Sequence, residues 1–329
     1  AATVPLYAGV IFVDDSNTTG IEDGTLPNPF NTIAEGLAAA AAGRLVFVFG
    51  GDYNESVNIV RSVLLIGEGF GLGGGSGFGS GEFPVVTGLG STGQGATIRV
   101  QGAAGANNVT IRGLDISNTG GFDAPAGGGG LPSILAGVVD DATAVLVGNT
   151  TTFDFAGNIV RNTPLGLVQW HLGAPAFGSR IAQNTFEGNG AAVTTVAVDS
   201  SGTTRILNND MTDNIAGVIA AAGRIASPTA CTVTHEIAGN WIEGAGIEAL
   251  LNPFLSGLSL PWLSAAPQLP EFGGVGILGL TGGDMTATYA IENNFVVDNI
   301  VGLAGIEFLG ANATYSVLDN VFFDNAIGT

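Results

Sequence analysis

A short motif recurs along this chain and constrains its fold more than any other feature of the sequence. Each copy has an apolar residue, two others, an Asn, one more residue and a second apolar residue, as in Ile181-Ala-Gln-Asn184-Thr-Phe186. The Asn of successive copies falls at Asn158, Asn184, Asn209, Asn240, Asn294 and Asn320, in steps of 26, 25, 31, 54 and 26 residues. Units of this size with two or three short strands are typical of the coils of a β-solenoid, which bury a continuous core by stacking.

The repeated Asn is expected to be structural. Asn tolerates the left-handed backbone region at turns between strands, and stacked Asn side chains can hydrogen-bond from coil to coil. The alternation within each copy directs one apolar side chain per short strand into the interior. We therefore expect Asn184, Asn209, Asn294 and Asn320 in one column, with Phe186, Met211, Val296 and Phe322 in the core.

The whole chain, residues 1–329, is predicted to be one domain with its coils over residues 44–329. Residues 1–43 are expected to cap the first coil, because its apolar interior and strand edges would otherwise be exposed. An Ala-rich stretch after Asn31 that stops at Gly43 predicts a short helix there, with Asn as its N-cap. Inserted loops are expected near 67–95, 118–132 and 249–276, where the repeat is broken.

The N-terminal region resembles a known group of proteins. The segments Asn28-Pro29-Phe30-Asn31-Thr32-Ile33, Gly51-Asp52-Tyr53-Asn54-Glu55 and Leu64-Leu65-Ile66-Gly67 are similar to the opening of pectin-lyase-like β-helix proteins, including pectin methylesterases. Together with the repeat, this resemblance implies an all-β, right-handed parallel β-helix. It implies little about function, because most of the catalytic motifs of pectin methylesterases have no counterpart in this chain.

The charge balance excludes several classes of partner. The net charge is −20, with eight Arg and no Lys. Nucleic acid, anionic lipid and polyanionic sugars each need a basic surface, so none of them is expected as a partner. Cysteine chemistry is also excluded as a source of stability, because Cys231 has no second cysteine for an intramolecular disulfide.

The protein is expected to be secreted or located at the cell surface. The sequence begins Ala1-Ala2-Thr3 without Met, as removal of a signal peptide would leave it. No uninterrupted apolar run is long enough to predict a transmembrane segment.

Carboxylates are the candidate catalytic groups, because hydrolysis of a glycosidic bond needs two of them on opposite sides of that bond. Asp140 and Asp141 are adjacent, but neighbouring residues of a strand point to opposite faces. Asp154-Phe155-Ala156-Gly157 resembles a shortened form of the segment that carries the catalytic Asp of pectin methylesterases. His171 and His235 lack metal-ligand spacing and are expected to be structural. These residues give only weak support for an enzyme.

No resident cofactor is expected, although bound calcium is a possibility, since calcium takes six to eight oxygen ligands. The candidate ligands are Asp14, Asp15 and Asp23 near the N-terminus and Asp210 with Asp213 further on. No complete calcium motif accompanies them.

Two functions remain open. The first is a non-catalytic structural solenoid of a surface assembly, filament or adhesin, which associates with itself or with another surface protein. Its expected interface is the apolar segment 249–276, through Leu250, Leu251, Phe254, Leu255, Leu258, Leu260, Trp262 and Leu263. The alternative is a carbohydrate-active lyase or hydrolase that acts on a neutral or cationic polysaccharide. An enzyme should show three or more carboxylates and an aromatic platform converging in one groove, whereas a structural protomer should show scattered carboxylates and an apolar contact surface.

Overall fold

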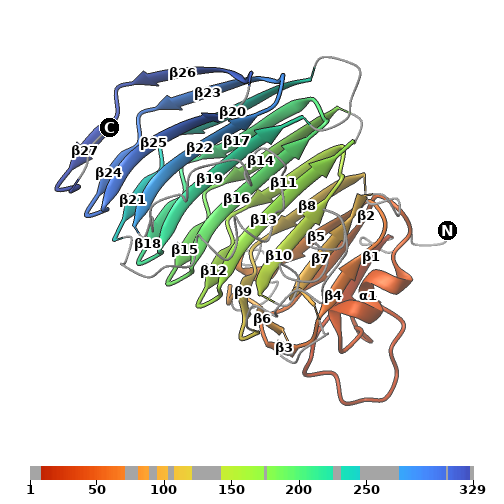
Figure 1. The fold of residues 1–329 in the computed structure, drawn as a ribbon. Helices are drawn as coiled ribbons and strands as arrows, with labels where there is room; N and C mark the ends of the chain where they lie inside the picture. The colour runs from red at the N-terminus through yellow and green to blue at the C-terminus, as the bar shows by residue number, and fades with distance from the viewer. Residues whose placement is uncertain are drawn as a thin grey trace.

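The chain winds into a right-handed parallel β-helix built from three sheets (Figure 1), which confirms the predicted fold class. The computed structural model describes residues 9–70, 81–88, 95–102, 107–120, 142–173, 176–224, 231–244, 274–308 and 310–326. All strand pairs between the sheet strands in these ranges are parallel, and each strand pairs with its equivalent in the next coil. No helix in the described ranges is long and apolar enough to cross a membrane.

The three sheets are named here by their number of strands. The ten-stranded sheet contains β1 (Val10–Val13), β2 (Arg44–Val48), β5 (Val63–Gly67), β8 (Asn108–Arg112), β11 (Thr152–Ala156), β14 (Phe177–Ala182), β17 (Gly202–Leu207), β20 (Thr232–Ala238), β23 (Thr286–Glu292) and β26 (Asn312–Leu318). The nine-stranded sheet contains β3 (Asp52–Asn54), β6 (Val85–Gly88), β9 (Asp115–Asn118), β12 (Ile159–Arg161), β15 (Thr185–Glu187), β18 (Asp210–Thr212), β21 (Trp241–Glu243), β24 (Phe295–Val297) and β27 (Val321–Phe323). The eight-stranded sheet contains β4 (Val57–Ile59), β7 (Ile98–Gln101), β10 (Thr143–Gly148), β13 (Leu165–Leu172), β16 (Ala191–Val198), β19 (Ala216–Gly223), β22 (Val275–Gly282) and β25 (Val301–Phe308). From β2 onward, each coil passes through the ten-, nine- and eight-stranded sheets in that order.

The six repeated Asn residues lie in one ladder at the corner between the ten- and nine-stranded sheets. Asn158 donates its backbone N–H to Oδ1 of Asn184 over 3.0 Å, and Asn184 donates in the same way to Asn209. The pattern continues through Asn240 and Asn294 to Asn320. Each amide Nδ2 also donates to a backbone carbonyl, as Asn184 does to Phe155 over 3.0 Å. The buried backbone N–H and carbonyl groups at each turn are thereby hydrogen-bonded by an Asn side chain, which the repeat supplies once per coil.

The left-handed backbone position is not on the ladder Asn itself, where the sequence reasoning put it. It falls on the residue before it, as at Gln183 (φ 57°), Asn208 (φ 52°) and Asp319 (φ 54°). Gly occupies the same position before Asn158 and Asn240. The ladder Asn is selected by its amide hydrogen bonds, and the residue before it by tolerance of positive φ.

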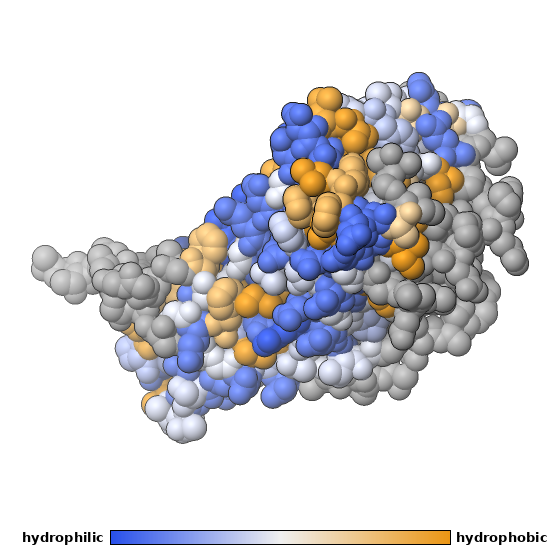
Figure 2. Space-filling view, turned by 90° about the vertical axis from the view of Figure 1, so that its left-hand side faces the viewer, coloured by the Kyte–Doolittle hydropathy of each residue, from blue (hydrophilic) through white to orange (hydrophobic). Residues whose placement is uncertain are grey.

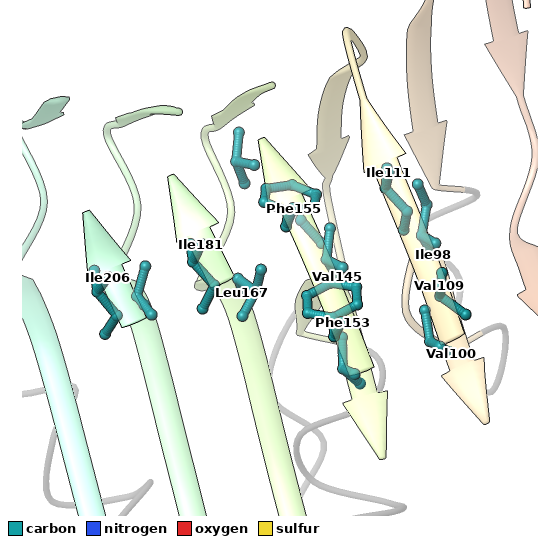
Figure 3. Close-up of a cluster of buried hydrophobic side chains, with 14 of the residues drawn as sticks. Ile98, Val100, Val109, Ile111, Val145, Phe153, Phe155, Leu167, Ile181 and Ile206 are labelled. Carbon is teal, nitrogen blue, oxygen red and sulfur yellow. The ribbon is translucent and has the colours of Figure 1, made fainter. Parts of the chain in front are cut away.

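The core lies between the three sheets and is filled by one to three side chains per strand. Figure 3 shows Phe153, Phe155 and Ile181 of the ten-stranded sheet facing Val145 and Leu167 of the eight-stranded sheet. Phe186, Met211 and Val296 are fully buried in this core, and Phe322 packs against it partly exposed. The sizes of side chains on facing sheets are matched across the interior. A Cβ on Gly305 would lie only 2.8 Å from Cζ of Tyr315, so no larger residue fits at position 305 without displacing the ring. Large rings on one sheet are therefore accommodated by Gly on the facing sheet.

The helix α1 (Ile33–Ala39) packs on β1, β2 and β4 at the N-terminal end of the solenoid. Its N-cap is Thr32 rather than the predicted Asn31, with the Thr32 hydroxyl accepting from the N–H of Glu35 over 3.2 Å. Glu55 accepts the N–H groups of Ile33 and Ala34 at 2.7 and 3.0 Å. A carboxylate from the first full coil thus satisfies donors that a helix start leaves free.

Strands lie within, or at the edge of, three of the predicted segments. The cap region 1–43 contains β1, which pairs with β2 as the first strand of the ten-stranded sheet. The segment 67–95 holds the short helix η1 (Glu68–Phe70) and β6, because Val86 is buried in the core. The third segment ends earlier than 276, since β22 begins at Val275. The rest of the predicted loops at 118–132 and 249–276 lies largely outside the described residues.

Candidate functional site

The outer face of the nine-stranded sheet is set by the repeat. The middle residue of each short strand points into the core, as Phe186 and Met211 do, so the residues on either side of it point outward. From β12 to β27 these outward pairs are Ile159 and Arg161, Thr185 and Glu187, Asp210 and Thr212, Trp241 and Glu243, Phe295 and Val297, and Val321 and Phe323. The outward side chains of this face are therefore those of the residues one and three positions after each ladder Asn.

An aromatic pair lies on this face. The rings of Trp241 and Phe295 stack with centroids 4.3 Å apart and planes 13° from parallel. Trp241 is 42% exposed, and its Nε1 donates to Oε2 of Glu243 over 2.7 Å. Glu243 thus fixes the plane of an indole ring that remains open to solvent.

Three carboxylates lie on the three consecutive strands β15, β18 and β21, namely Glu187, Asp210 and Glu243. Burial raises the pKa of Asp210, and repulsion from Glu243 and then Glu187 raises it further. Asp210 is therefore close enough to both glutamates for their charges to act on it. Their combined field favours a cation or a proton donor at this position.

Asp115 continues the acidic row toward the N-terminal end. It is only 5% exposed, and one of its oxygens pairs with Arg161 of the next coil. The other oxygen, Oδ1, is buried without a hydrogen-bond partner. Burial raises the pKa of Asp115, the charge of Arg161 opposes that change, and Glu187 adds to it.

Figure 2 views the side of the molecule on which the nine-stranded sheet lies, the left-hand side of Figure 1. Hydrophilic residues form broad bands there, with smaller hydrophobic patches among them. Hydrophilic bands and hydrophobic patches are thus interleaved on this side, an arrangement that suits an amphiphilic ligand rather than a purely apolar one.

The predicted candidate Asp154 lies elsewhere, on the outer face of the ten-stranded sheet. Its Oδ1 pairs with Arg180 at 2.9 Å, and its Oδ2 pairs with Arg112, whose guanidinium lies over the ring of Phe70. In register with them, Arg205 pairs with Glu236 at 2.9 Å. Asp154 is therefore held between two cations in a row of ion pairs and has no carboxylate beside it in that row.

The outer face of the eight-stranded sheet is apolar from β10 onward in the described residues. Val168, Ile219, Leu278 and Leu280 are almost fully buried there, and the one polar side chain in their rows is Thr194. These rows offer no acid or base for catalysis.

The two histidines are buried inside the solenoid, where the sequence analysis expected structural roles. His171 stacks on Phe177 at 3.8 Å and contacts the amide of Gln169, while His235 stacks on Tyr289 at 5.2 Å. Burial lowers the pKa of His171 to about 3 and that of His235 to about 4. Both are therefore neutral components of the core at ordinary pH.

The predicted metal ligands do not form a shared site in the described part of the chain. Asp14 and Asp23 accept hydrogen bonds from residues two positions ahead, Asp15 accepts the N–H of Asp52, and Asp213 occupies a left-handed turn position. No group of three His, Cys, Asp or Glu side chains in the described ranges could hold a metal ion. Calcium binding stays a prediction.

Several other predicted residues cannot be placed. Asp140, Asp141 and the whole predicted interface, Leu250, Leu251, Phe254, Leu255, Leu258, Leu260, Trp262 and Leu263, lie outside the described residues. The acidic and aromatic face was missed, although Asn240-Trp241 and Asn294-Phe295 carry the signal: an aromatic residue directly after a ladder Asn.

Comparison with known proteins gives a family for the chain. The family described as "Protein of unknown function (DUF1565)" matches residues 16–327. This chain belongs to that family. No curated protein matches this DUF1565 chain.

Solved structures similar to the DUF1565 chain include two pectin methylesterases. The enzyme from Aspergillus niger, in deglycosylated form, is 15% identical, with 96% of this chain and 86% of the other covered and a TM-score of 0.47. PemA from Erwinia chrysanthemi is 13% identical, with 94% and 89% covered and a TM-score of 0.48.

Proposed function

We propose that this protein is a secreted or cell-surface β-helix that binds a neutral or cationic polysaccharide, without cleaving it, on the outer face of its nine-stranded sheet. The observation that carries the proposal is the exposed ring of Trp241, stacked on Phe295 and oriented by Glu243. An oriented, solvent-exposed aromatic ring presents a flat apolar surface whose negative π face attracts the C–H groups of a sugar.

The neighbouring carboxylates supply the polar half of such a site. Glu187 and Asp210 lie on the two strands preceding Trp241, where their oxygens can accept hydrogen bonds from sugar hydroxyls or ammonium groups. The net charge of −20 disfavours polyuronates and other polyanions and favours neutral or cationic chains.

A binding panel tests the proposal. Purified protein would be titrated by calorimetry with a neutral glucan, a deacetylated amino-sugar polymer and polygalacturonate. Binding to the glucan, the amino-sugar polymer or both is expected, with none to polygalacturonate and no cleavage or de-esterification of it with or without calcium. Trp241→Ala should lower the affinity about tenfold, the loss of roughly 1.4 kcal/mol of ring contact.

The matched control is Leu64→Ala, because Leu64 is also 42% exposed but lies on the outer face of the ten-stranded sheet. The affinity of the Leu64→Ala variant for each polymer should equal that of the unmodified protein. Absence of binding to both the neutral and the cationic polymer, or equal binding by Trp241→Ala, would refute the proposal. Release of reducing ends that is lost in Asp210→Asn would instead establish the hydrolase alternative.

Self-association as a surface structural protein is a second candidate, and the last described coil favours it. β25, β26 and β27 form the ends of the three sheets, and Leu318, Val321 and Phe323 are 54%, 47% and 64% exposed on them. Exposed strand edges with apolar side chains readily pair with another chain. The predicted contact through 249–276 would add a second self-association surface.

A further inference from the structure

We infer that the bound polysaccharide is a polymer of protonated amino sugars that runs along the solenoid axis, one sugar per coil, with its amines on Glu187, Asp210 and Glu243. This inference rests on the proposed polysaccharide-binding function and names its ligand. It is carried by the spacing of the carboxylates, the orientation of Trp241, an unpaired buried oxygen on Asp115 and the charge of the face.

The spacing of the three carboxylates matches an extended sugar chain. Glu187, Asp210 and Glu243 occupy successive strands of a parallel sheet, one per coil, with Asp210 two residues out of register with the two glutamates. Strands in a sheet lie about 4.8 Å apart, so the carboxylates repeat at about that interval along the axis. An extended chain of 1,4-linked six-membered sugars advances by about the same distance per ring. Each ring can therefore present one amine to each coil.

The free face of Trp241 lies beside the middle carboxylate. Phe295 of the following coil covers one face of the indole, so the other face is turned toward the preceding strand β18. The residue of β18 in register with Trp241 is Asp210. A cation seated there meets a π face on one side and a carboxylate on the other, and both attract an ammonium group. A neutral hydroxyl group would gain much less binding free energy than an ammonium group from contact with the indole face and the Asp210 carboxylate.

Asp115 provides a further acceptor on the same face. Its Oδ1 is buried without a hydrogen-bond partner, a costly condition for a carboxylate oxygen, and Glu187 acts on it electrostatically. A donor on a bound polymer would relieve that cost. Asp115 lies two strands before Glu187, so a polymer along the axis passes over both strands.

The charge of the face also selects a cation. Among the described outward residues of the strands from β9 to β24, Arg161 is the one cation, and Asp115 pairs with it. Three carboxylates are then left without a cationic partner among the described ion pairs. A polymer with one positive charge per sugar can neutralise all three, whereas a small cation finds no cluster of three ligands among the described residues.

Two oligosaccharides that differ only in charge test the inference. The protein would be titrated with a hexamer of 1,4-linked glucosamine and with its fully N-acetylated counterpart, at a mildly acid pH where the amines are protonated. The deacetylated hexamer should bind at least about tenfold more tightly, consistent with two or more ion pairs of about 0.5–1 kcal/mol each. Added salt should weaken that preference by screening.

Charge-neutralising variants identify the face. Asp210→Asn and Glu187→Gln should each weaken binding of the deacetylated hexamer about threefold to fivefold, and should weaken binding of the acetylated hexamer by a smaller factor. Glu236→Gln, which removes the same charge from the outer face of the ten-stranded sheet, should change neither affinity. Equal melting temperatures of the variants would establish that they are folded.

The outcomes separate this inference from the function on which it rests. Equal affinity for the two hexamers, or binding insensitive to Asp210→Asn and Glu187→Gln, would overturn the amino-sugar assignment but leave the proposed function standing, provided that Trp241→Ala still lowered the affinity for a neutral glucan. Loss of all polysaccharide binding, or no effect of Trp241→Ala on any polymer, would overturn the proposed function itself.

Discussion

Asn209 accepts at a single oxygen, Oδ1, both the backbone N–H and the side-chain Nδ2 of Asn184, each over 3.0 Å. In turn its own Nδ2 donates to Oδ1 of Asn240 over 2.9 Å and to the carbonyl of Ile181 over 3.0 Å. Each rung of the ladder therefore satisfies groups in the coils on both sides. The coils are joined at this corner by side chains as well as by the sheets.

Removing one rung should destabilise the solenoid. In Asn209→Leu, the buried N–H of Asn184 and the carbonyl of Ile181 lose their partners, so the free energy of unfolding should fall by about 1–3 kcal/mol. Denaturant unfolding followed by circular dichroism measures the change. The neighbouring Asn208→Gly is the control: Asn208 is exposed with φ 52°, which Gly adopts freely, so its stability should change little. Equal stability of both variants would contradict the structural role of the ladder.

Stability should also depend on the protonation of the core histidines. In the folded protein the pKa of His235 is about 4 and that of His171 about 3, because both are buried. An unfolded His takes up its proton near pH 6.5, so the unfolded state binds more protons between these values. Stability is therefore fully present above about pH 6.5 and falls as the pH decreases toward the folded values, by about 1.4 kcal/mol per pH unit for each histidine.

His235→Phe isolates this effect, because Phe preserves a ring against Tyr289 and cannot take up a proton. The difference in unfolding free energy between the two proteins, measured at several pH values, should shift in favour of the variant as the pH falls below about 6.5. Taking the difference cancels the common contribution of the carboxylates. A difference that is independent of pH would show that His235 is protonated in the folded state.

The N-terminal helix should depend on Glu55. In Glu55→Ala the N–H groups of Ile33 and Ala34 lose their acceptor at the start of α1, which should cost about 1–2 kcal/mol. Hydrogen exchange at α1 should accelerate. Glu35→Ala, which removes an exposed carboxylate from the same first turn, should have a smaller effect. Faster exchange in Glu35→Ala than in Glu55→Ala would reverse this assignment.

Self-association through the last described coil can be separated from polysaccharide binding. Phe323→Asp places a charge on the most exposed apolar side chain of that coil and should dissociate any assembly that uses it. Trp262→Asp with Leu258→Asp tests the predicted contact of segment 249–276. Light scattering at low and high salt measures both, and association of the unmodified chain should strengthen with salt, which screens its net charge of −20. An unmodified protein that is monomeric at all salt concentrations would rule this candidate out.

The repeat made the solenoid predictable, because a buried turn amide must be satisfied in every coil and Asn is the residue that does so. The helix was also predictable from its composition, but not its cap: Thr32 and Asn31 are both capping residues, and the choice depends on the Glu55 carboxylate, which comes from a later coil. β6 was missed because its strand signal is four residues long and lies within a Gly-rich segment, where burial of Val86 decides its conformation.

The candidate site was harder to predict than the fold. Asp154 resembled a catalytic residue in its local sequence, yet its neighbours in space are Arg112 and Arg180, which come from other coils. Glu187, Asp210 and Glu243 are far apart in sequence and come together only when the coils are aligned by their ladder Asn. Aligning the repeat and reading the outward positions in columns would have found them.

Tryptophan fluorescence is the most direct measure of polysaccharide binding at the proposed face. The chain has three Trp, of which Trp241 is the one on the outer face of the nine-stranded sheet in the described residues. Titration with the deacetylated hexamer should change the emission saturably, and Trp241→Phe should abolish that change while calorimetry still detects binding to the remaining ring. A saturable change of equal size in Trp241→Phe would place the ligand elsewhere, and no heat and no change in the unmodified protein would contradict the account.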